Sequence, residues 1–279
     1  MKGQLTRIEV QDSIGWIKIN RERKLNALNR ELIDQLHDRI INFQNHRSVK
    51  VIVLTGTGNK AFVAGADISE FSSFEPEQAA AFARHGNQVL FDLITQLEKP
   101  VIAAINGYAL GGGLELAMSC HLRIAVQHAK LGLPEVSLGV IPGYGGTQRL
   151  PALIGKGNAM EMILTGDIIS ADKALELGLI NQVVAAEKLH EATIILAKRL
   201  MKNSPNSIKN AIKAINASDS TLKGLKKKIF SFPCVSELLI LKKVLLLFSK
   251  KENLNFKLHK PRWSPAALTL LTAAPVHIQ

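Results

Sequence analysis

The sequence predicts an α/β fold, in which strands and helices alternate, followed by a helical C-terminal region. The 279 residues are 47% hydrophobic but only 5% aromatic, a composition typical of a large aliphatic core. Apolar strands and amphipathic helices alternate as far as about Val184, which is the order of an α/β domain. Beyond Ala186 the strand signals fade and helical spacing of apolar residues dominates.

The chain opens with a predicted hairpin, since Ile8–Val10 and Trp16–Ile19 alternate in polarity on either side of the turn residues Asp12–Gly15. Val51–Leu54 is an unbroken apolar run of the kind found in strands buried on both faces, and 101–105 and 122–126 are similar. The predicted helices are 29–43, 78–97, 114–118, 147–154 with a kink or break at Pro151, 157–164, 189–201 and 207–215.

The net charge of +12 is concentrated in the C-terminal third. Residues 1–197 carry 19 basic and 20 acidic side chains, 198–228 carry 9 and 1, and 229–279 carry 7 and 2. The lysines of 198–228 fit either a solvated helical face or a polyanion site, such as one for the phosphates of a nucleotide-like cofactor. Because no aromatic residues are interleaved with them, a nucleic-acid partner is not expected.

Three features of the sequence bear on where the protein works. No apolar run reaches the eighteen or so residues that a membrane span needs, so we expect no membrane insertion. The start, Met1–Gln4, leads directly into a strand pattern and does not resemble a secretory signal. Cys120 and Cys234 are the only cysteines, which favours a reducing cytoplasm with each thiol as a small buried residue. The histidines lack metal-binding spacing, so no metal site is expected.

The segment Gly56–Ala61 superficially matches the glycine fingerprint of a dinucleotide site. Such a site needs a helix directly after the glycines, whereas Phe62–Asp67 offers small residues instead. A tight turn is therefore the better interpretation.

Two small-residue segments could present backbone amides to an anionic oxygen. Ala64–Ile68 lets another molecule approach its backbone closely, and Gly111–Gly113 opens the predicted helix 114–118, where amides and the helix dipole converge. Together they could form an oxyanion hole, although close helix packing is the alternative for the glycines.

Two glutamates follow unusual backbone. Glu115 comes directly after Gly111–Gly113 and Leu114, and Glu135 lies between Pro134 and Val136 in an apolar stretch. A buried carboxylate without a role is costly, though stabilisation by the helix dipole is an alternative for Glu115. Paired carboxylates beside exposed amides suggest acid/base chemistry on a polarised carbonyl.

At this point the residues match a known pattern: from about Ile8 to Ile229 the chain resembles the enoyl-CoA hydratases of the crotonase superfamily. The motifs that carry the resemblance are Arg23–Leu28, Lys60–Ile68, Ile105–Leu116 and Leu133–Leu150. The resemblance implies a crotonase-like spiral of repeated ββα units with a C-terminal helical trimerisation region.

The resemblance also implies a function, the addition of water to a short- or medium-chain 2-enoyl-CoA. The amides of Ala66 and Gly112 would bind the thioester oxygen, and Glu115 and Glu135 would activate one water, which the amide of Gly143 would contact. Coenzyme A, as part of the substrate, would meet Ala64, Ala66, Asp67 and Ile68, with no separate cofactor. Lys24, in a basic loop before a helix, is a further candidate for its phosphates, with a solvated loop as the alternative. A trimer or a pair of stacked trimers is implied; an enoyl-CoA isomerase and an RNA-binding member of the same family are alternatives.

The C-terminal end departs from that family. We predict a core over 1–195, a helical region over 196–233 and an aberrant tail over 234–279. Relatives end in a segment resembling F-G-T-x-D-x-K-E-G-x-x-A-F-x-x-K-R-x-P-x-F, and codon degeneracy allows a DNA for Cys234–Lys257 whose neighbouring frame encodes such an ending. We hypothesise a frameshift near Phe232–Cys234, with a divergent tail as the alternative; an uninterrupted frame on resequencing that region would rule the frameshift out.

Overall fold

The computed structural model describes residues 4–67, 70 and 76–217. By its internal contacts the chain divides into two units, Met1–Ser231 and Phe232–Gln279, and all described residues belong to the first. The predicted tail, 234–279, and the end of the predicted helical region therefore lie outside the described residues, so the predicted domain boundaries stay predictions.

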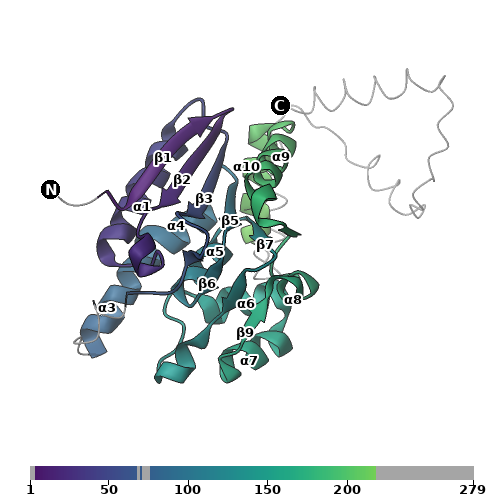
Figure 1. Ribbon diagram of the computed structural model, residues 1–279. Helices are drawn as coiled ribbons and strands as arrows, with labels where there is room; N and C mark the ends of the chain where they lie inside the picture. Colours follow the sequence, from purple (N-terminus) through teal and green to yellow (C-terminus); the bar gives the residue numbers. More distant parts are fainter. Residues whose placement is uncertain (1–3, 68–69, 71–75, 218–279) are drawn as a thin grey trace, which may run out of the picture. The chain divides into compact units, whose positions relative to one another are not determined.

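Six strands form the larger sheet, whose centre is buried on both faces (Figure 1). In spatial order they are β1 (Thr6–Gln11), β2 (Ile14–Ile19), β3 (Val51–Gly56), β5 (Val101–Ile105), β7 (Leu122–Val126) and β10 (Gln182–Val184). Only β1 runs antiparallel to its neighbour, as the predicted hairpin requires, and all other pairs are parallel. Every residue of β3 and β5 is buried, which explains their unbroken apolar sequences.

A second, four-stranded sheet consists of β4 (Ala61–Val63), β6 (Tyr108–Leu110), β8 (Lys130–Gly132) and β9 (Ile168–Ser170). Each long parallel strand is followed by one short strand of this sheet: β3 by β4, β5 by β6 and β7 by β8. The chain thus places one strand in each sheet per turn and then forms a helix, which makes a spiral of ββα units. This confirms the predicted α/β spiral.

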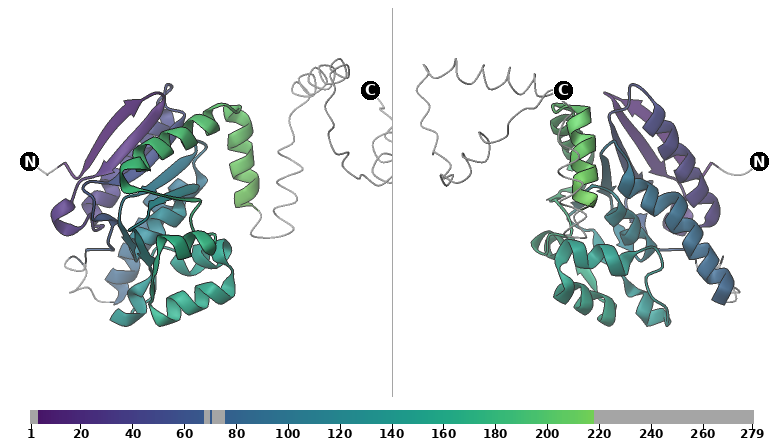
Figure 2. Two further views of the ribbon diagram at one scale, coloured as in Figure 1. Left: turned by 45° about the vertical axis from the view of Figure 1, so that its right-hand side comes forward. Right: turned by 180° about the vertical axis from the view of Figure 1, so that it is seen from behind.

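Helices cover both faces of the larger sheet. Figure 2 shows α1 on one face and α9 on the other, and α9 contacts β3, β5 and β7. The helices, including 3-10 and π-helical turns, are η1 (Glu22–Lys24), α1 (Arg30–Asn45), α3 (Pro76–Gly86), η2 (Asn87–Phe91), α4 (Asp92–Gln96), α5 (Gly112–Ser119), η3 (Pro134–Leu138), α6 (Gly146–Ile154), α7 (Lys156–Thr165), α8 (Ala171–Glu176), η4 (Ala186–Lys188), α9 (Leu189–Met201) and α10 (Pro205–Asn216). Within the described ranges no helix is long and apolar enough to span a bilayer.

The predicted helices 78–97 and 147–154 are present, with details that the sequence did not specify. The long helix consists of α3, a π-helical turn and α4 in succession, and in the π-helical turn Asp92 donates its amide to the carbonyl of Asn87 five positions earlier. Pro151 lies inside α6 and does not end it, which excludes the predicted break but leaves the alternative of a kink. The turn interpretation of Gly56–Ala61 was correct, since the strand β4 and not a helix follows.

Candidate active site

Glu115 lies in the first turn of α5, where that helix leaves the edge of the second sheet. Gly111 precedes the helix with φ 51°, a left-handed conformation that favours glycine. Gly113 lies so close to β4 that a Cβ there would be 1.9 Å from the carbonyl oxygen of Val63. These two glycines bring the start of α5 into the core, and Glu115 is only 1% exposed.

The carboxylate of Glu115 is fixed by a glycine turn that lies about thirty residues further along the chain. Its Oε1 accepts hydrogen bonds from the amides of Tyr144 (2.8 Å) and Gly146 (2.7 Å). Burial and, to a lesser extent, the charge of Glu135 raise the pKa of Glu115 from 4.5 to about 7, against the lowering effect of the two amides and of Arg149. Such a group can exchange a proton near neutral pH.

Glu135 lies in η3, which starts with Pro134 at its first position. Its Oε1 approaches the start of α5, since a Cβ on Gly111 would be 3.0 Å from that atom. Its Oε2 is buried and has no hydrogen-bond partner among the described residues. Burial raises the pKa of Glu135. The structure therefore brings the two predicted glutamates close enough for the charge of Glu135 to act on Glu115, and one buried oxygen of Glu135 has no partner among the described residues.

Ala66 and Gly112 follow two neighbouring parallel strands, β4 and β6, whose carboxyl ends lie at the same edge of the second sheet. Leu28 forms a parallel bridge with Ala66: its amide donates to Gly65 (2.8 Å) and its carbonyl accepts from Asp67 (2.7 Å). In that pattern the amide of Ala66 points away from Leu28. The amide of Gly112 is in the first turn of α5, where no intrahelical acceptor exists.

The residues predicted to meet coenzyme A form one surface loop region, as far as the structure describes them. Lys24 is exposed in η1, and the next residue, Leu25, accepts the amide of Ala64 (3.1 Å). Asp67 follows Ala66 directly, whereas Ile68 lies outside the described residues. Lys24, Ala64 and Asp67 are thus neighbours of the Ala66 amide, and their contact with a ligand stays a prediction.

Arg21 and Asn26 connect this loop to the sheet, and the sequence analysis missed both. Arg21 forms a 2.8 Å ion pair with Asp67 and also donates to the carbonyl of Ala27. Asn26 donates to the carbonyl of Ala61 (2.8 Å) and accepts the amide of Arg21 (3.0 Å). The positive φ of Asn26, 59°, is a conformation that asparagine tolerates better than most residues. Asn26 lies within the motif Arg23–Leu28 and Arg21 just before it. Their partners Ala61 and Asp67 are distant in sequence, so these contacts could not be predicted.

Gly143 reaches the site through its neighbours. Its carbonyl accepts from Asn87 Nδ2 (2.8 Å), and the next residue, Tyr144, donates its amide to Glu115. The predicted contact of the Gly143 amide with a water stays a prediction. The glycine-rich turn was visible in the sequence; that it would bind the Glu115 carboxylate was not.

The basic C-terminal region is partly engaged within the fold. Lys209 and Lys213 of α10 both pair with Glu98, at 2.7 and 2.9 Å. These two lysines form specific ion pairs and not only a solvated face, while the lysines after 217 lie outside the described residues.

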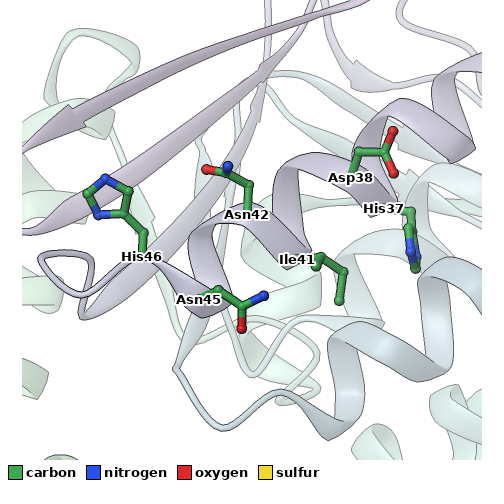
Figure 3. Close-up of a pocket in the computed structure, with 6 residues that line it drawn as sticks. All are labelled: His37, Asp38, Ile41, Asn42, Asn45 and His46. Atoms are coloured by element: carbon green, nitrogen blue, oxygen red, sulfur yellow. The ribbon is translucent and has the colours of Figure 1, made fainter.

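A hollow on the surface of α1 is separate from the predicted site residues (Figure 3). It is lined by His37, Asp38, Ile41, Asn42, Asn45 and His46. The ring of His37 is already hydrogen-bonded to the carbonyl of Val89 (2.7 Å). The hollow shares no residue with the glutamate pair.

The raised pKa of Glu115 predicts a gain in stability for Glu115→Gln at high pH. A carboxyl whose folded pKa lies above its unfolded value stabilises the fold below the unfolded pKa and loses that contribution as pH rises through the folded one. Here the loss extends from about pH 4.5 to about pH 7. Glutamine keeps an oxygen for both amides, so we expect the variant to gain on the order of 2–3 kcal/mol relative to the parent between pH 5 and pH 8.

Urea unfolding of both proteins at pH 5 and pH 8 measures this gain. Glu161→Gln, which changes an exposed glutamate of α7, is the matched control and should give no pH-dependent difference. Identical pH dependence in the parent and Glu115→Gln would contradict the raised pKa.

The chain is similar to known proteins both in sequence and in structure. The sequence model of the family described as "Enoyl-CoA hydratase/isomerase" matches residues 9–231. The chain is similar to a short-chain-enoyl-CoA hydratase of Clostridium acetobutylicum, with 44% identity over 75% of this chain and 80% of that protein. It is similar to a crotonyl-CoA hydratase of Syntrophomonas wolfei, with 42% identity over 77% and 82%. The crystal structure of an enoyl-CoA hydratase from Bacillus anthracis superposes with a TM-score of 0.80 at 38% identity, over 91% of this chain and 99% of that one.

Proposed function

Because this chain belongs to the enoyl-CoA hydratase/isomerase family, we propose that it is an enoyl-CoA hydratase, a hydro-lyase that reversibly adds water to 2-enoyl-CoA. The observation that carries the proposal is the pair Glu115 and Glu135: Glu115 lies in the first turn of α5, Glu135 approaches Gly111 just before that helix, and the charge of Glu135 raises the pKa of Glu115. Two such groups around one water suit hydration better than isomerisation, which moves a proton without adding water.

The proposed reaction uses both glutamates and both amides. As the water oxygen bonds to C3, one glutamate, as carboxylate, takes its proton. The electrons of the C2–C3 double bond move toward the thioester oxygen, which the amides of Ala66 and Gly112 stabilise as an enolate. The second glutamate, protonated, then delivers its proton to C2. The sum is one water added, and no redox change occurs.

The substrate class follows from the same proposal. Relatives named for short-chain enoyl-CoA and crotonyl-CoA support a short or medium acyl chain, with coenzyme A bound as part of the substrate and not as a separate cofactor. A contact of Lys24 with the nucleotide end is supported by its exposure and by the hydrogen bond that joins the next residue, Leu25, to Ala64. A cytoplasmic location accords with this metabolic role.

We also propose assembly into trimers, singly or stacked in pairs. Large apolar side chains are exposed in η3, in the segment after it and in α7, namely Leu138 (63%), Ile141 (71%) and Leu164 (69%), and η3 contacts α7. Apolar surface of this kind is typical of a protein interface. A version of the chain with the restored ending, that is, the ending encoded by the neighbouring reading frame, is expected to support this assembly. Size-exclusion chromatography of this version beside the unaltered chain would measure it.

Crotonyl-CoA is the substrate for the direct test. We expect the chain to convert it to 3-hydroxybutyryl-CoA, measured by loss of the enoyl-thioester absorbance and by identification of the product. The version with the restored ending is assayed in parallel. If only this version is active, the tail of the unaltered chain is the cause of the inactivity; if neither is active, the site itself does not hydrate crotonyl-CoA. Isomerisation of a 3-enoyl-CoA without hydration, or salt-sensitive RNA binding without hydration, would contradict the proposal.

A further inference from the structure

The turn that binds Glu115 is itself held by one helical segment and one arginine. Asn87 Nδ2 donates to the carbonyl of Gly143 (2.8 Å). The ring of Phe91 stacks on that of Tyr144, with centroids 4.5 Å apart and planes within 8°. Arg149 donates to the carbonyl of Tyr144 (2.6 Å). The carbonyls of Gly143 and Tyr144 and the ring of Tyr144 are therefore all held by residues that lie outside the turn.

The π-helical turn η2 makes these contacts possible. Its hydrogen bond joins the amide of Asp92 to the carbonyl of Asn87, five residues earlier. In a regular α-helix residues five apart differ by roughly 140° around the axis, so they would face different ways. The wider turn brings Asn87 and Asp92 closer to one face. Asn87 then contacts Gly143, and Asp92 forms a 2.9 Å ion pair with Arg149. Interruptions of this kind are frequent at functional sites.

Arg149 joins the two sides of this arrangement. One guanidinium nitrogen bonds the carbonyl of Tyr144 and another bonds Asp92, while the side chain is only 17% exposed. A Cβ on Gly145 would lie 2.2 Å from the first of these nitrogens, so the guanidinium fills the space beside the turn. The planar fork of arginine can reach both acceptors at once, which a lysine cannot.

We propose that Arg149 is a positioning residue, which, anchored by Asp92 directly after the π-helical turn, orients the amides of Tyr144 and Gly146 that bind the Glu115 carboxylate. The inference rests on the proposed hydratase function and adds to it a residue that touches neither the substrate nor the water. The charged or titratable groups whose charge acts on Glu115 are Glu135 from η3, Arg149 from α6 and, when ionised, Tyr144. Of these, Arg149 is the one that favours the carboxylate form.

Arg149→Met tests the proposal. We expect kcat for crotonyl-CoA hydration to fall roughly 10- to 100-fold, because misplacing a catalytic group by about 1 Å has effects of this size, with KM changed less than about threefold. The pKa of Glu115, followed by carbon-13 NMR of labelled carboxyl groups, should rise, because a nearby cation and two oriented amides are weakened together. Arg149→Lys keeps the positive charge, so the pKa of Glu115 should rise less than in Arg149→Met. Because lysine cannot bond Tyr144 and Asp92 together, kcat should still be well below that of the parent.

The matched control is Arg47→Met, which removes an exposed arginine after α1 and should leave kcat and the Glu115 pKa unchanged. Folded Arg149→Met with parental kcat and parental Glu115 pKa would overturn the proposal, since a merely stabilising arginine would lower only the thermal midpoint. If Arg149→Met does not fold, Asp92→Asn decides: a severalfold loss of kcat supports the anchor, and parental kcat overturns it. Should the parent fail to hydrate crotonyl-CoA, the proposed function falls, while the NMR pKa still decides whether Arg149 acts on Glu115.

Discussion

Glu115→Gln is expected to lower kcat for crotonyl-CoA hydration by about 10³-fold or more, with little change in KM. Proton transfer by one positioned side chain contributes roughly 10²- to 10⁴-fold. Glutamine has nearly the same shape and retains an acceptor for the amides of Tyr144 and Gly146, at 2.8 and 2.7 Å in the parent, so the site should keep its geometry. The variant isolates the loss of the proton-carrying oxygen from any loss of structure. Stopped-flow and steady-state rates at saturating substrate give the measurement.

Glu135→Gln and the double variant show whether the two glutamates act on one water. If they do, each single change should cost about as much as both together, because groups that act as a unit are not additive. Multiplicative losses in the double variant would place them in separate steps. A Glu115→Gln enzyme with more than a tenth of the parental kcat would contradict the proposed role of Glu115. Glu161→Gln on α7 is again the control with unchanged rate.

The glutamates could be predicted because their signals are local. Gly111–Gly113 before a helix and Pro134 before Glu135 both mark backbone that a carboxylate seldom follows without a role. What holds Glu115 could not be predicted, because the partner amides of Tyr144 and Gly146 come from a turn whose position depends on the packing of two other helices. For the same reason the ion pair of Arg149 and Asp92 could not be predicted, since the two residues lie on different helices, α6 and α4.

The fold shows a similar division between local and distant signals. Long strands such as β3 and β5 are buried on both faces and show this in their composition. The second sheet was implied only by the family resemblance, since its strands have three residues each, too few for any periodic pattern. Its pairs depend on the spiral itself, which stacks β4, β6 and β8 from successive units. The π-helical turn η2 was not predicted, because the residues that it contacts, in the Tyr144 turn, are also distant in sequence.

Gly113→Ala is the substitution for which we expect the largest loss of stability. Alanine is the better helix former by about 1 kcal/mol, so local preference alone predicts a gain in α5. The added Cβ would instead lie 1.9 Å from the carbonyl oxygen of Val63, which belongs to β4 and cannot move without disturbing the second sheet. Overpacking typically costs 1–3 kcal/mol, and a clash with backbone should cost at least about 3. Thermal denaturation should show a midpoint lower by roughly 6–12 °C.

The same change should also lower hydration, because Gly112 and Glu115 lie on the helix that must shift. Gly157→Ala in α7 is the matched control: a Cβ there meets nothing within 4 Å, so only the helix preference acts and stability should rise by about 0.5–1 kcal/mol. Opposite signs for the two substitutions would show that contact with Val63, and not helix propensity, requires glycine at 113. Gly113→Ala as stable as the parent would mean that α5 is free to move away from β4. In that case the backbone at Gly112 would not be held against the edge that carries Ala66, and the two amides could not act as a preformed oxyanion hole.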